Sequence, residues 1–360
     1  MNKLFASSLA IGVVGFISLP LSALDWTDKV SLTGFASANF HQTDDAAPFN
    51  GESGNGHDNQ GSYAGTRFGL NVRAKVNDTF SFASQLFATK EEDNYAAHVD
   101  WAFGTMHLSE NVDFRAGKLK FPVGLVNEYA DVGYAYPWLH APAAFYSGMG
   151  APNGPQVTRE SYTGASLLWE IPTDDWIFSV DFYDGEVNLE GTNVRQLGGM
   201  TFKADWNDEV LFQLSSYKGN MRDVEIEGNP IMSALMEGAQ HKANTFAVKV
   251  DIDNYLGMFE IADVEMGDIN AMSASTWYMT LGYRINDFLP FVTIENYEQG
   301  EPVDDDQKIT TLGLRWDVLS DVAVKFEISR IKLNRGLGLF TSQPEGDTVN
   351  MIGFGIDTVF

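Results

Sequence analysis

The chain has 360 residues, a formal net charge of -26 and no cysteine. The absence of cysteine excludes thiol catalysis, thiolate metal sites and disulfides. The acidic balance argues against nucleic acid as a partner, because phosphate contacts need clustered Lys and Arg.

The N-terminal stretch has the pattern of an export signal. Lys3 gives a short positive region, an uncharged apolar stretch follows, and Ala23 supplies the small residue at the expected cleavage site. A membrane helix is the alternative interpretation, but Pro20 and two glycines interrupt the apolar run. We therefore expect a signal peptide over 1–23 and a mature protein over 24–360, in which no other segment is long and apolar enough for a membrane helix.

Apolar and polar residues alternate throughout the mature chain, in segments of about ten residues. In 66–76, for example, even positions are apolar or Thr and odd positions are polar or Gly. This pattern predicts an all-β fold, a transmembrane antiparallel barrel of sixteen strands with an apolar face toward lipid and a polar face toward a water-filled lumen. The predicted strands are 30–40, 66–76, 80–89, 99–108, 112–117, 162–171, 176–183, 199–206, 210–217, 245–253, 257–265, 276–285, 289–297, 309–318, 322–329 and 349–360.

Two of these segments fit the pattern less well. Pro290 interrupts 289–297, and Pro is poorly tolerated inside a sheet. The segment 80–89 is nearly apolar on both faces. If one hairpin is misassigned, the barrel has fourteen or eighteen strands, so the strand count depends on segments such as these.

The connectors between the segments alternate between tight and long. Seven are tight and rich in turn residues, and the eight between them are mostly longer and polar or Gly-rich, as in 41–63, 220–243 and 334–347. This asymmetry is typical of an outer-membrane barrel with short periplasmic turns and long extracellular loops. The tight turns are 77–78, 109–111, 172–175, 207–208, 253–254, 286–287 and 320–321.

Aromatic residues gather within a few residues of the tight turns, where amphipathic rings favour the lipid headgroup level. The last segment ends on Phe360, and a terminal Phe on an alternating strand resembles the assembly signal of outer-membrane barrels. The clustered rings are Phe80, Trp169, Trp176, Trp206, Tyr255, Tyr283, Phe288 and Trp316.

The most specific motif is Arg-Ala-Gly-Lys-Leu-Lys-Phe-Pro-Val-Gly-Leu over 115–125. It is similar to the strand-end motif of the phosphate-selective (O/P-type) porins, in which basic residues, Pro-x-Gly and an apolar residue lead into the third loop. With its sixteen segments, the chain resembles the sixteen-stranded porins of Gram-negative outer membranes. The resemblance implies an outer-membrane location, a homotrimer in contact with lipid and lipopolysaccharide, and a third loop folded into the lumen.

The third long connector, 120–155, fits such a loop. It holds five of the twelve prolines and seven large aromatic residues. Its backbone is therefore restricted, and its rings can pack against a barrel wall. An external loop that packs on a neighbouring subunit is the alternative interpretation. We expect this segment to form the constriction of the pore.

The candidate pore residues follow from the strand phase and this loop. Opposing charges across a constriction create a transverse field that orients polar solutes. Strict alternation points Lys118 and Lys120 toward lipid. They face inward only if a β-bulge near Gly117 redirects them. The other interpretation is that these charges only solvate the lumen. The candidates are Glu128 and Asp131 on the loop, and Arg67, Arg73, Arg115, Lys118 and Lys120 on the wall.

Composition argues against carrying phosphate selectivity over from the family. A multivalent anion needs a dense ladder of basic groups, whereas here 49 acidic residues outnumber 23 basic ones. The sequence therefore predicts a porin for passive diffusion of small hydrophilic solutes and ions, general or mildly cation-preferring. The alternatives are an anion-selective or phosphate-selective porin, and a barrel enzyme or surface receptor with a closed lumen.

No cofactor or metal motif is present in the sequence. The six histidines show no HExxH spacing, and there is no Gly-x-Ser-x-Gly motif or Walker loop. A barrel hydrolase needs a His beside a nucleophile or acids near the rim, but Ser and Asp are too common here to identify such a site. We therefore expect no enzyme activity, no cofactor and no metal.

Overall fold

The computed structural model describes residues 29–52, 55–63, 65–91, 94–147, 161–189, 192–225, 230–267, 273–300 and 304–360. The expected signal peptide lies outside these ranges. Among the helices found in them, none has the length and hydropathy needed to span a membrane.

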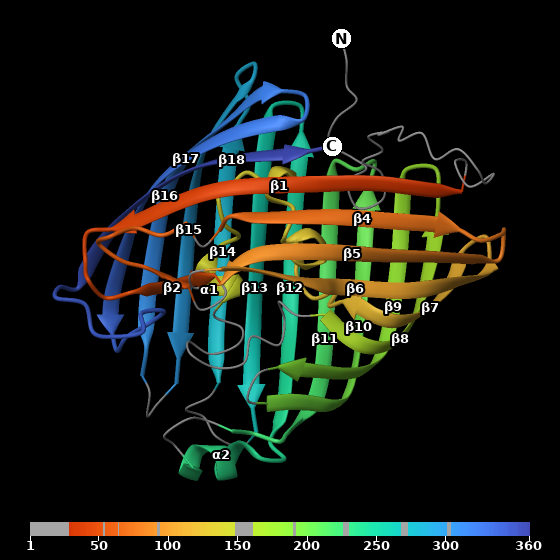
Figure 1. Ribbon diagram of the computed structural model, residues 1–360, viewed down its shortest axis with the longest axis horizontal. Coiled ribbons are helices and arrows are strands. Elements are labelled where there is room, and N and C mark those ends of the chain that lie inside the picture. Colours follow the sequence, from red (N-terminus) through yellow and green to blue (C-terminus); the bar gives the residue numbers. More distant parts are fainter. Residues whose placement is uncertain are drawn as a thin grey trace.

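Sixteen antiparallel strands form one closed barrel, in which each strand pairs with its neighbours in sequence and β1 also pairs with β18. Each of the sixteen predicted segments is one of these strands, so the predicted fold class and strand count are confirmed. Figure 1 shows β1, β4 and β5 crossing in front of β12 to β15. The barrel strands are β1 (Val30–Thr43), β4 (Arg67–Lys75), β5 (Phe80–Glu91), β6 (Asn94–Ser109), β7 (Val112–Lys120), β8 (Ser161–Pro172), β9 (Trp176–Leu189), β10 (Thr192–Trp206), β11 (Val210–Arg222), β12 (Gln240–Ile252), β13 (Tyr255–Met266), β14 (Ala274–Tyr283), β15 (Phe288–Gln299), β16 (Asp306–Leu319), β17 (Val322–Arg335) and β18 (Thr348–Val359).

The remaining elements lie in the connectors. A small hairpin of β2 (Phe49–Glu52) and β3 (Asn55–His57) lies between β1 and β4. The helix α2 (Pro230–Met236) lies between β11 and β12. Three short helical turns, η1 (Asn127–Tyr129), η2 (Gly133–Ala135) and α1 (Ala143–Tyr146), lie between β7 and β8.

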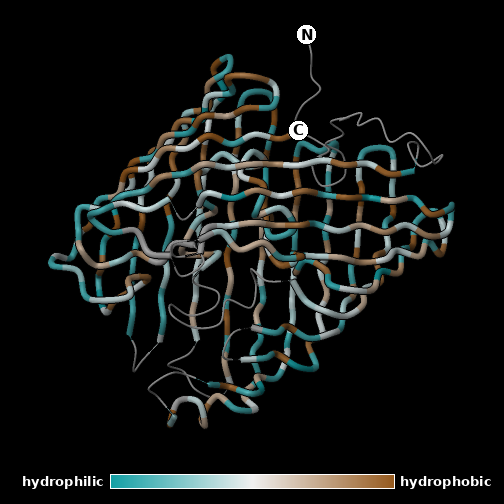
Figure 2. Tube along the Cα trace, viewed as in Figure 1, coloured by the Kyte–Doolittle hydropathy of each residue, from teal (hydrophilic) through white to brown (hydrophobic). Residues whose placement is uncertain are grey.

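The alternation that predicts the strands also sorts their side chains between two faces. In β4, the Arg67 side chain is buried while the neighbouring Phe68 is 41% exposed. In β18, Ile352, Phe354 and Ile356 are all about half exposed. Figure 2 shows the resulting alternation of hydrophobic and hydrophilic residues along the strands. The exposed apolar residues form an outer face suited to contact lipid, and the polar residues point into the barrel.

The barrel closes where the last residue meets the first strand. The backbone N–H of Gly34 donates to the Phe360 carbonyl oxygen at 2.7 Å, and the Phe360 N–H donates back to Gly34 at 2.9 Å. The Phe360 ring stacks on the outward-facing Phe68, with 6.1 Å between the ring centroids. The terminal aromatic residue therefore takes part in the closing seam.

The two segments that fitted the pattern less well are both strands. Pro290 pairs with Leu314 of β16, and on its other side the ladder with β14 ends one residue later, at Phe291. The missing N–H of Pro290 therefore falls at the end of that ladder. In β5, the inward-facing Phe87 is buried against Phe35, which explains why this strand is apolar on both faces.

Two predicted connectors are shorter than expected, and in the first of them β5 and β6 continue pairing until Glu91 faces Asn94. In the second, we expected a long loop between Tyr183 and Gly199, but β9 and β10 continue pairing until Leu189 faces Thr192. A β-bulge interrupts the alternation, because the register shifts near Gln196, which has a φ of 52°. The inward-facing pattern changes phase at that bulge, so the periodicity ends before the hairpin does.

Candidate functional site

Residues 121–147, the described part of the third connector, form what we call the inserted loop. This loop lies inside the ring of strands, where Figure 1 shows it in yellow around α1. It contains η1, η2 and α1 and is largely buried against the inward-facing side chains of the wall. The contacts that hold it define the candidate site.

The start of the inserted loop is anchored by an aromatic cluster. Phe121 is fully buried, and its ring lies 5.9, 5.5 and 4.8 Å from those of Tyr162, Tyr183 and Tyr217. All three contacts are edge-on, the arrangement that aromatic pairs favour. The loop is therefore fixed to β8, β9 and β11 as soon as it leaves β7.

Farther along, a buried carboxylate of β13 binds two parts of the loop. Glu260 accepts the backbone N–H of Leu125 at 2.9 Å and also the hydroxyl of Tyr146. The hydroxyl of Tyr278 on β14 donates to the same carboxylate at 2.5 Å. Buried backbone N–H groups need hydrogen-bond acceptors. The Glu260 carboxylate is the acceptor for this part of the loop, as the carbonyl groups of a neighbouring strand are within a sheet.

Two further wall carboxylates bind the second half of the loop in the same way. The Glu327 carboxylate on β17 accepts the backbone N–H of Leu139, and that of Glu295 on β15 accepts the N–H of Ala144, both at 2.9 Å. The inserted loop is thus bound on opposite sides of the barrel, which gives it one defined position across the lumen.

Charged pairs lie where the loop approaches β7 to β10. Glu128 accepts from the Lys203 ammonium group at 2.5 Å, and Arg115 donates to Asp181 at 2.5 Å and to the Ser166 hydroxyl at 2.9 Å. The positive charge of Lys203, and after it that of Arg115, holds the pKa of Glu128 below its usual value. The loop therefore presents a carboxylate that is ionised at neutral pH to the basic groups of the wall.

A second charged cluster forms at the end of β7. The Lys120 ammonium group lies 2.8 Å from a carboxylate oxygen of Asp131 on the loop and 2.8 Å from one of Asp100 on β6. Burial disfavours the ionised Asp131 carboxylate, but Lys120 outweighs this effect and the pKa of Asp131 is lowered. Asp100 reaches the cluster because a β-bulge in β6 shifts its register against β5 between Gln85 and Leu86.

The structure does not place Lys118 in either cluster. Its ammonium group donates to the Val99 carbonyl oxygen at 3.0 Å in an exposed position. The pairing of β7 with both neighbours continues without a register shift through Gly117. The bulge we expected near Gly117 is therefore wrong, and the bulge that matters lies in β6, at Asp100.

The two arginines of β4 differ in their surroundings. Arg67 is buried and donates to the hydroxyl of Tyr136 on the loop at 2.5 Å. Arg73 is exposed on the same strand, six residues nearer the tight-turn end. Of the seven candidates, the structure thus brings Arg67, Lys120, Glu128 and Asp131 into direct loop–wall contacts, with Arg115 beside Glu128.

Sequence analysis missed the wall carboxylates that bind the loop, above all Glu260. In β13 the inward-facing residues next to it are Met258 and Ala262, and both are buried. The inserted loop covers this part of the wall, so its inward face is apolar and resembles a lipid-facing one. The signal in the sequence was the carboxylate of Glu260 at the centre of an otherwise apolar row of inward-facing residues.

A search of protein-family models and a search of curated protein sequences gave no match. Solved structures are nevertheless similar in fold. The chain aligns over 92% of its length with an anion-selective porin from Comamonas acidovorans, with a TM-score of 0.65, 12% identity and 99% of that chain covered. It also aligns over 92% with OmpF of Salmonella typhi in complex with daunomycin (TM-score 0.62, 12% identity, 97% of that chain covered) and with the trimer form of in-vitro folded OmpT of Vibrio cholerae (TM-score 0.60, 14% identity, 99% of that chain covered).

These similarities and the closed ring of sixteen strands define the class of the protein. It has the porin-type β-barrel fold, and exposed apolar residues form a band on its outward face. Barrels of this kind lie in the outer membrane of Gram-negative bacteria. The O/P-type branch is not specified by these structural similarities.

Proposed function

We propose that this barrel is a passive channel for small hydrophilic solutes and ions, and that the inserted loop forms its constriction. The observation that carries the proposal is the contact between Glu128 on the loop and Lys203 on the wall, beside the Arg115–Asp181 pair. The pair joins the loop to the wall, so the aqueous path would run beside it, and fixed charges at the edge of a narrow path favour polar solutes over apolar ones.

A general or mildly cation-preferring pore is the selectivity that the charge pattern supports. Six inward-facing bases are paired with acids, so they do not form a ladder of free positive charge. A phosphate-selective pore needs such a ladder to replace the hydration of the anion. The pairs are Arg115–Asp181, Lys120–Asp131, Lys203–Glu128, Arg284–Asp251, Arg315–Asp317 and Lys325–Asp357.

We also propose a homotrimer in the membrane. The trimer form of the Vibrio cholerae protein supports this assembly by similarity of fold. Chemical cross-linking of the purified protein in detergent should give one band at three times the monomer mass. A single monomer band under the same conditions would contradict the trimer without affecting the channel proposal.

Single-channel recording of the refolded protein in planar bilayers tests the channel directly. We expect stable open steps in groups of three and, in a salt gradient, a reversal potential whose sign indicates weak cation preference. A folded barrel that gives no conductance would contradict the proposal and favour a receptor or enzyme with a closed lumen.

A third part of the proposal concerns lipopolysaccharide. Lys308 and Lys332 face each other across β16 and β17, and Arg330 lies next to them opposite Thr310. All three side chains are exposed on the outer face, and the structure gives them no acidic partner among the residues it describes. Phosphate groups of a lipid in the outer leaflet would complement this positive cluster.

A further inference from the structure

Three residues on neighbouring strands of the barrel form a continuous hydrogen-bonded array. The hydroxyl oxygen of Ser81 on β5 lies 3.2 Å from Nε2 of His107 on β6. Nδ1 of His107 lies 2.7 Å from a carboxylate oxygen of Asp113 on β7. His107 and Asp113 are directly opposite each other in the register, and Ser81 is opposite Thr105, one inward position away.

The array fixes which nitrogen of His107 carries a proton. The Asp113 carboxylate can only accept a hydrogen bond, so Nδ1 is the donor to it. In the neutral imidazole Nε2 is then an acceptor, and the Ser81 hydroxyl donates to it. This is the order of contacts in a nucleophile, general base and orienting acid, with each nitrogen in the role that acyl transfer requires.

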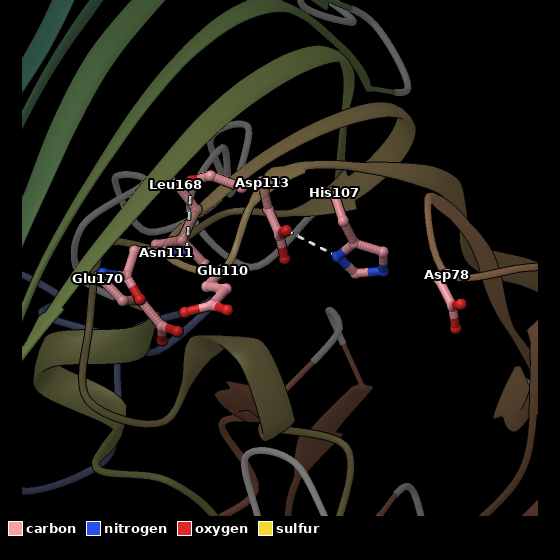
Figure 3. Close-up of a pocket in the computed structure, with 8 residues that line it drawn as sticks. Asp78, His107, Glu110, Asn111, Asp113, Leu168 and Glu170 are labelled. Atoms are coloured by element: carbon pink, nitrogen blue, oxygen red, sulfur yellow. Dashed lines mark hydrogen bonds and ion pairs between the residues drawn. The ribbon is translucent and has the colours of Figure 1, made fainter.

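His107 and Asp113 line a cavity of about 360 Å³ near the tight turns, and Ser81 contacts the Nε2 side of the imidazole just beyond this lining. Figure 3 shows His107 and Asp113 joined by their hydrogen bond at the edge of this cavity, with Asp78 on one side and Glu110 and Glu170 on the other. His107 and Asp113 keep 39% and 32% of their side chains exposed, so a solute in the cavity can reach the imidazole. The volume is within the range of small-molecule sites.

We propose that Ser81, His107 and Asp113 form a hydrolytic site for small, neutral or cationic esters. The four acidic side chains of the cavity disfavour anionic substrates, and Leu168 supplies one apolar wall for a short acyl group. This inference does not rest on the proposed channel, because the array would act on any ester that enters the cavity from the tight-turn end.

The first half of the reaction transfers the acyl group to the protein. The Ser81 oxygen attacks the ester carbonyl carbon while Nε2 of His107 takes the hydroxyl proton, which gives a tetrahedral oxyanion. The intermediate collapses, the bond to the alcohol oxygen breaks, and that oxygen takes the proton back from Nε2. The products of this half are the free alcohol and acyl-Ser81.

The second half returns the protein to its starting state. Nε2 takes a proton from water as the water oxygen attacks the acyl carbon, and the proton then returns to the Ser81 oxygen as the carboxylic acid leaves. The sum is ester plus water giving acid plus alcohol, with no other reactant. Asp113 is a positioning residue, since it orients the imidazole and stabilises its protonated form.

Lys75 is the group that we assign to the oxyanion. It faces Ser81 directly across the β4–β5 ladder, and its ammonium group lies 2.8 Å from Asp78 at the cavity. A positive charge at that place stabilises negative charge that develops on the carbonyl oxygen. Lys75→Met should therefore slow the acylation step while leaving the Ser81–His107 contact in place.

The test uses the refolded full-length protein in detergent. Hydrolysis of 4-nitrophenyl acetate is measured for the parent and for Ser81→Ala, His107→Asn and Ser84→Ala, and each protein is treated with a fluorophosphonate and mapped by peptide mass spectrometry. Ser84 is the matched control, because it is a serine of the same strand opposite the outward-facing Val72. Folding is checked by heat-modifiable mobility and by conductance.

We expect label on Ser81, loss of label and hydrolysis in Ser81→Ala, a decrease of about 100-fold in His107→Asn, and no change in Ser84→Ala. Hydrolysis that is equal in the parent and Ser81→Ala, or label on other serines only, would overturn the proposal. A folded, conducting parent that shows neither hydrolysis nor labelling would also overturn it. Loss of conductance with retained hydrolysis would instead contradict the channel alone.

Discussion

Lys325 and Asp357 form an ion pair of 2.8 Å between β17 and β18, and both side chains are almost completely buried. The same ammonium group donates to the Gly133 carbonyl oxygen at 2.6 Å and to that of Trp138 at 2.7 Å. One wall cation thus binds both ends of a six-residue stretch of the inserted loop. The pair therefore connects the stability of the barrel with the position of the loop.

Replacing this cation should release the loop and destabilise the barrel. In Lys325→Met the Asp357 carboxylate stays buried without its partner, which typically costs about 3 to 5 kcal/mol. We expect a lower urea midpoint for unfolding in detergent, and larger, noisier single-channel steps because the stretch from Gly133 to Trp138 loses its donor. Lys218→Met is the control, since Lys218 is exposed on the outer face of β11. Equal midpoints for the two variants would contradict this role of Lys325.

The second prediction concerns selectivity at Glu128. Glu128→Gln removes the negative charge that pairs with Lys203 and leaves the positive charges of Lys203 and Arg115 facing the path. The reversal potential in a salt gradient should then shift toward anion preference, while the step size changes little. Glu265→Gln is the matched control, because Glu265 pairs with Lys242 on the outer face of the barrel. An equal shift in both variants would mean that Glu128 has no special place in the pore.

The third prediction concerns pH and follows from the lowered pKa of Glu128. A lowered pKa means that the Glu128–Lys203 pair is fully formed above the ordinary glutamate pKa of about 4.3 and is lost only as the pH falls through the lower value of the folded protein. The contribution of Glu128 to ion selectivity, measured as the difference between the parent and Glu128→Gln, should therefore remain constant from neutral pH to about pH 5 and change only below the ordinary value. A shift centred between pH 5 and 7 that is absent from Glu128→Gln would contradict the lowered pKa.

The strands were predictable because lipid imposes one simple rule on them. An outward residue in the membrane-spanning part of any strand meets hydrocarbon, so alternation persists even in β15, which contains Pro290. The inward face follows no such rule. Where the loop covers it, as at Met258 and Ala262, apolar residues are favoured, and where water fills it, as at Arg73 and Lys75, charges are favoured.

The candidate site was predictable only as a set of charges. Strand phase placed Arg115 on the inward face, but which wall base meets Glu128 depends on how the 27 residues of the inserted loop fold across the lumen. We expected Glu128 to face arginines, and its nearest base is Lys203. Strand phase does not predict the contact between Lys120 and Asp100, because the β-bulge that brings Asp100 to Lys120 lies on a different strand.

The final prediction concerns the positive cluster of Lys308, Arg330 and Lys332. Like charges on directly opposing residues destabilise a sheet, so Lys308 opposite Lys332 is a pairing that the isolated barrel does not favour. Directly toward the middle of the membrane, Leu312 and Ile328 are each 63% exposed. A phosphorylated lipid would relieve the repulsion and cover the exposed apolar side chains. Its phosphates would neutralise the bases, and its acyl chains would contact the apolar residues.

Changing all three bases to Gln should therefore have opposite effects in two environments. In detergent without lipopolysaccharide, the variant should be slightly more stable than the parent, by roughly 0.2–1 kcal/mol, because the repulsion is removed. In vesicles that contain lipopolysaccharide, the parent should gain stability and the variant should gain little, and less lipopolysaccharide should copurify with the variant. In zwitterionic vesicles without lipopolysaccharide, the variant should keep the small advantage that it has in detergent. Lys218→Gln controls for loss of an outward charge elsewhere. If parent and variant retain equal amounts of lipopolysaccharide, the cluster is not its binding site, and the repulsion between Lys308 and Lys332 must be relieved by solvent alone.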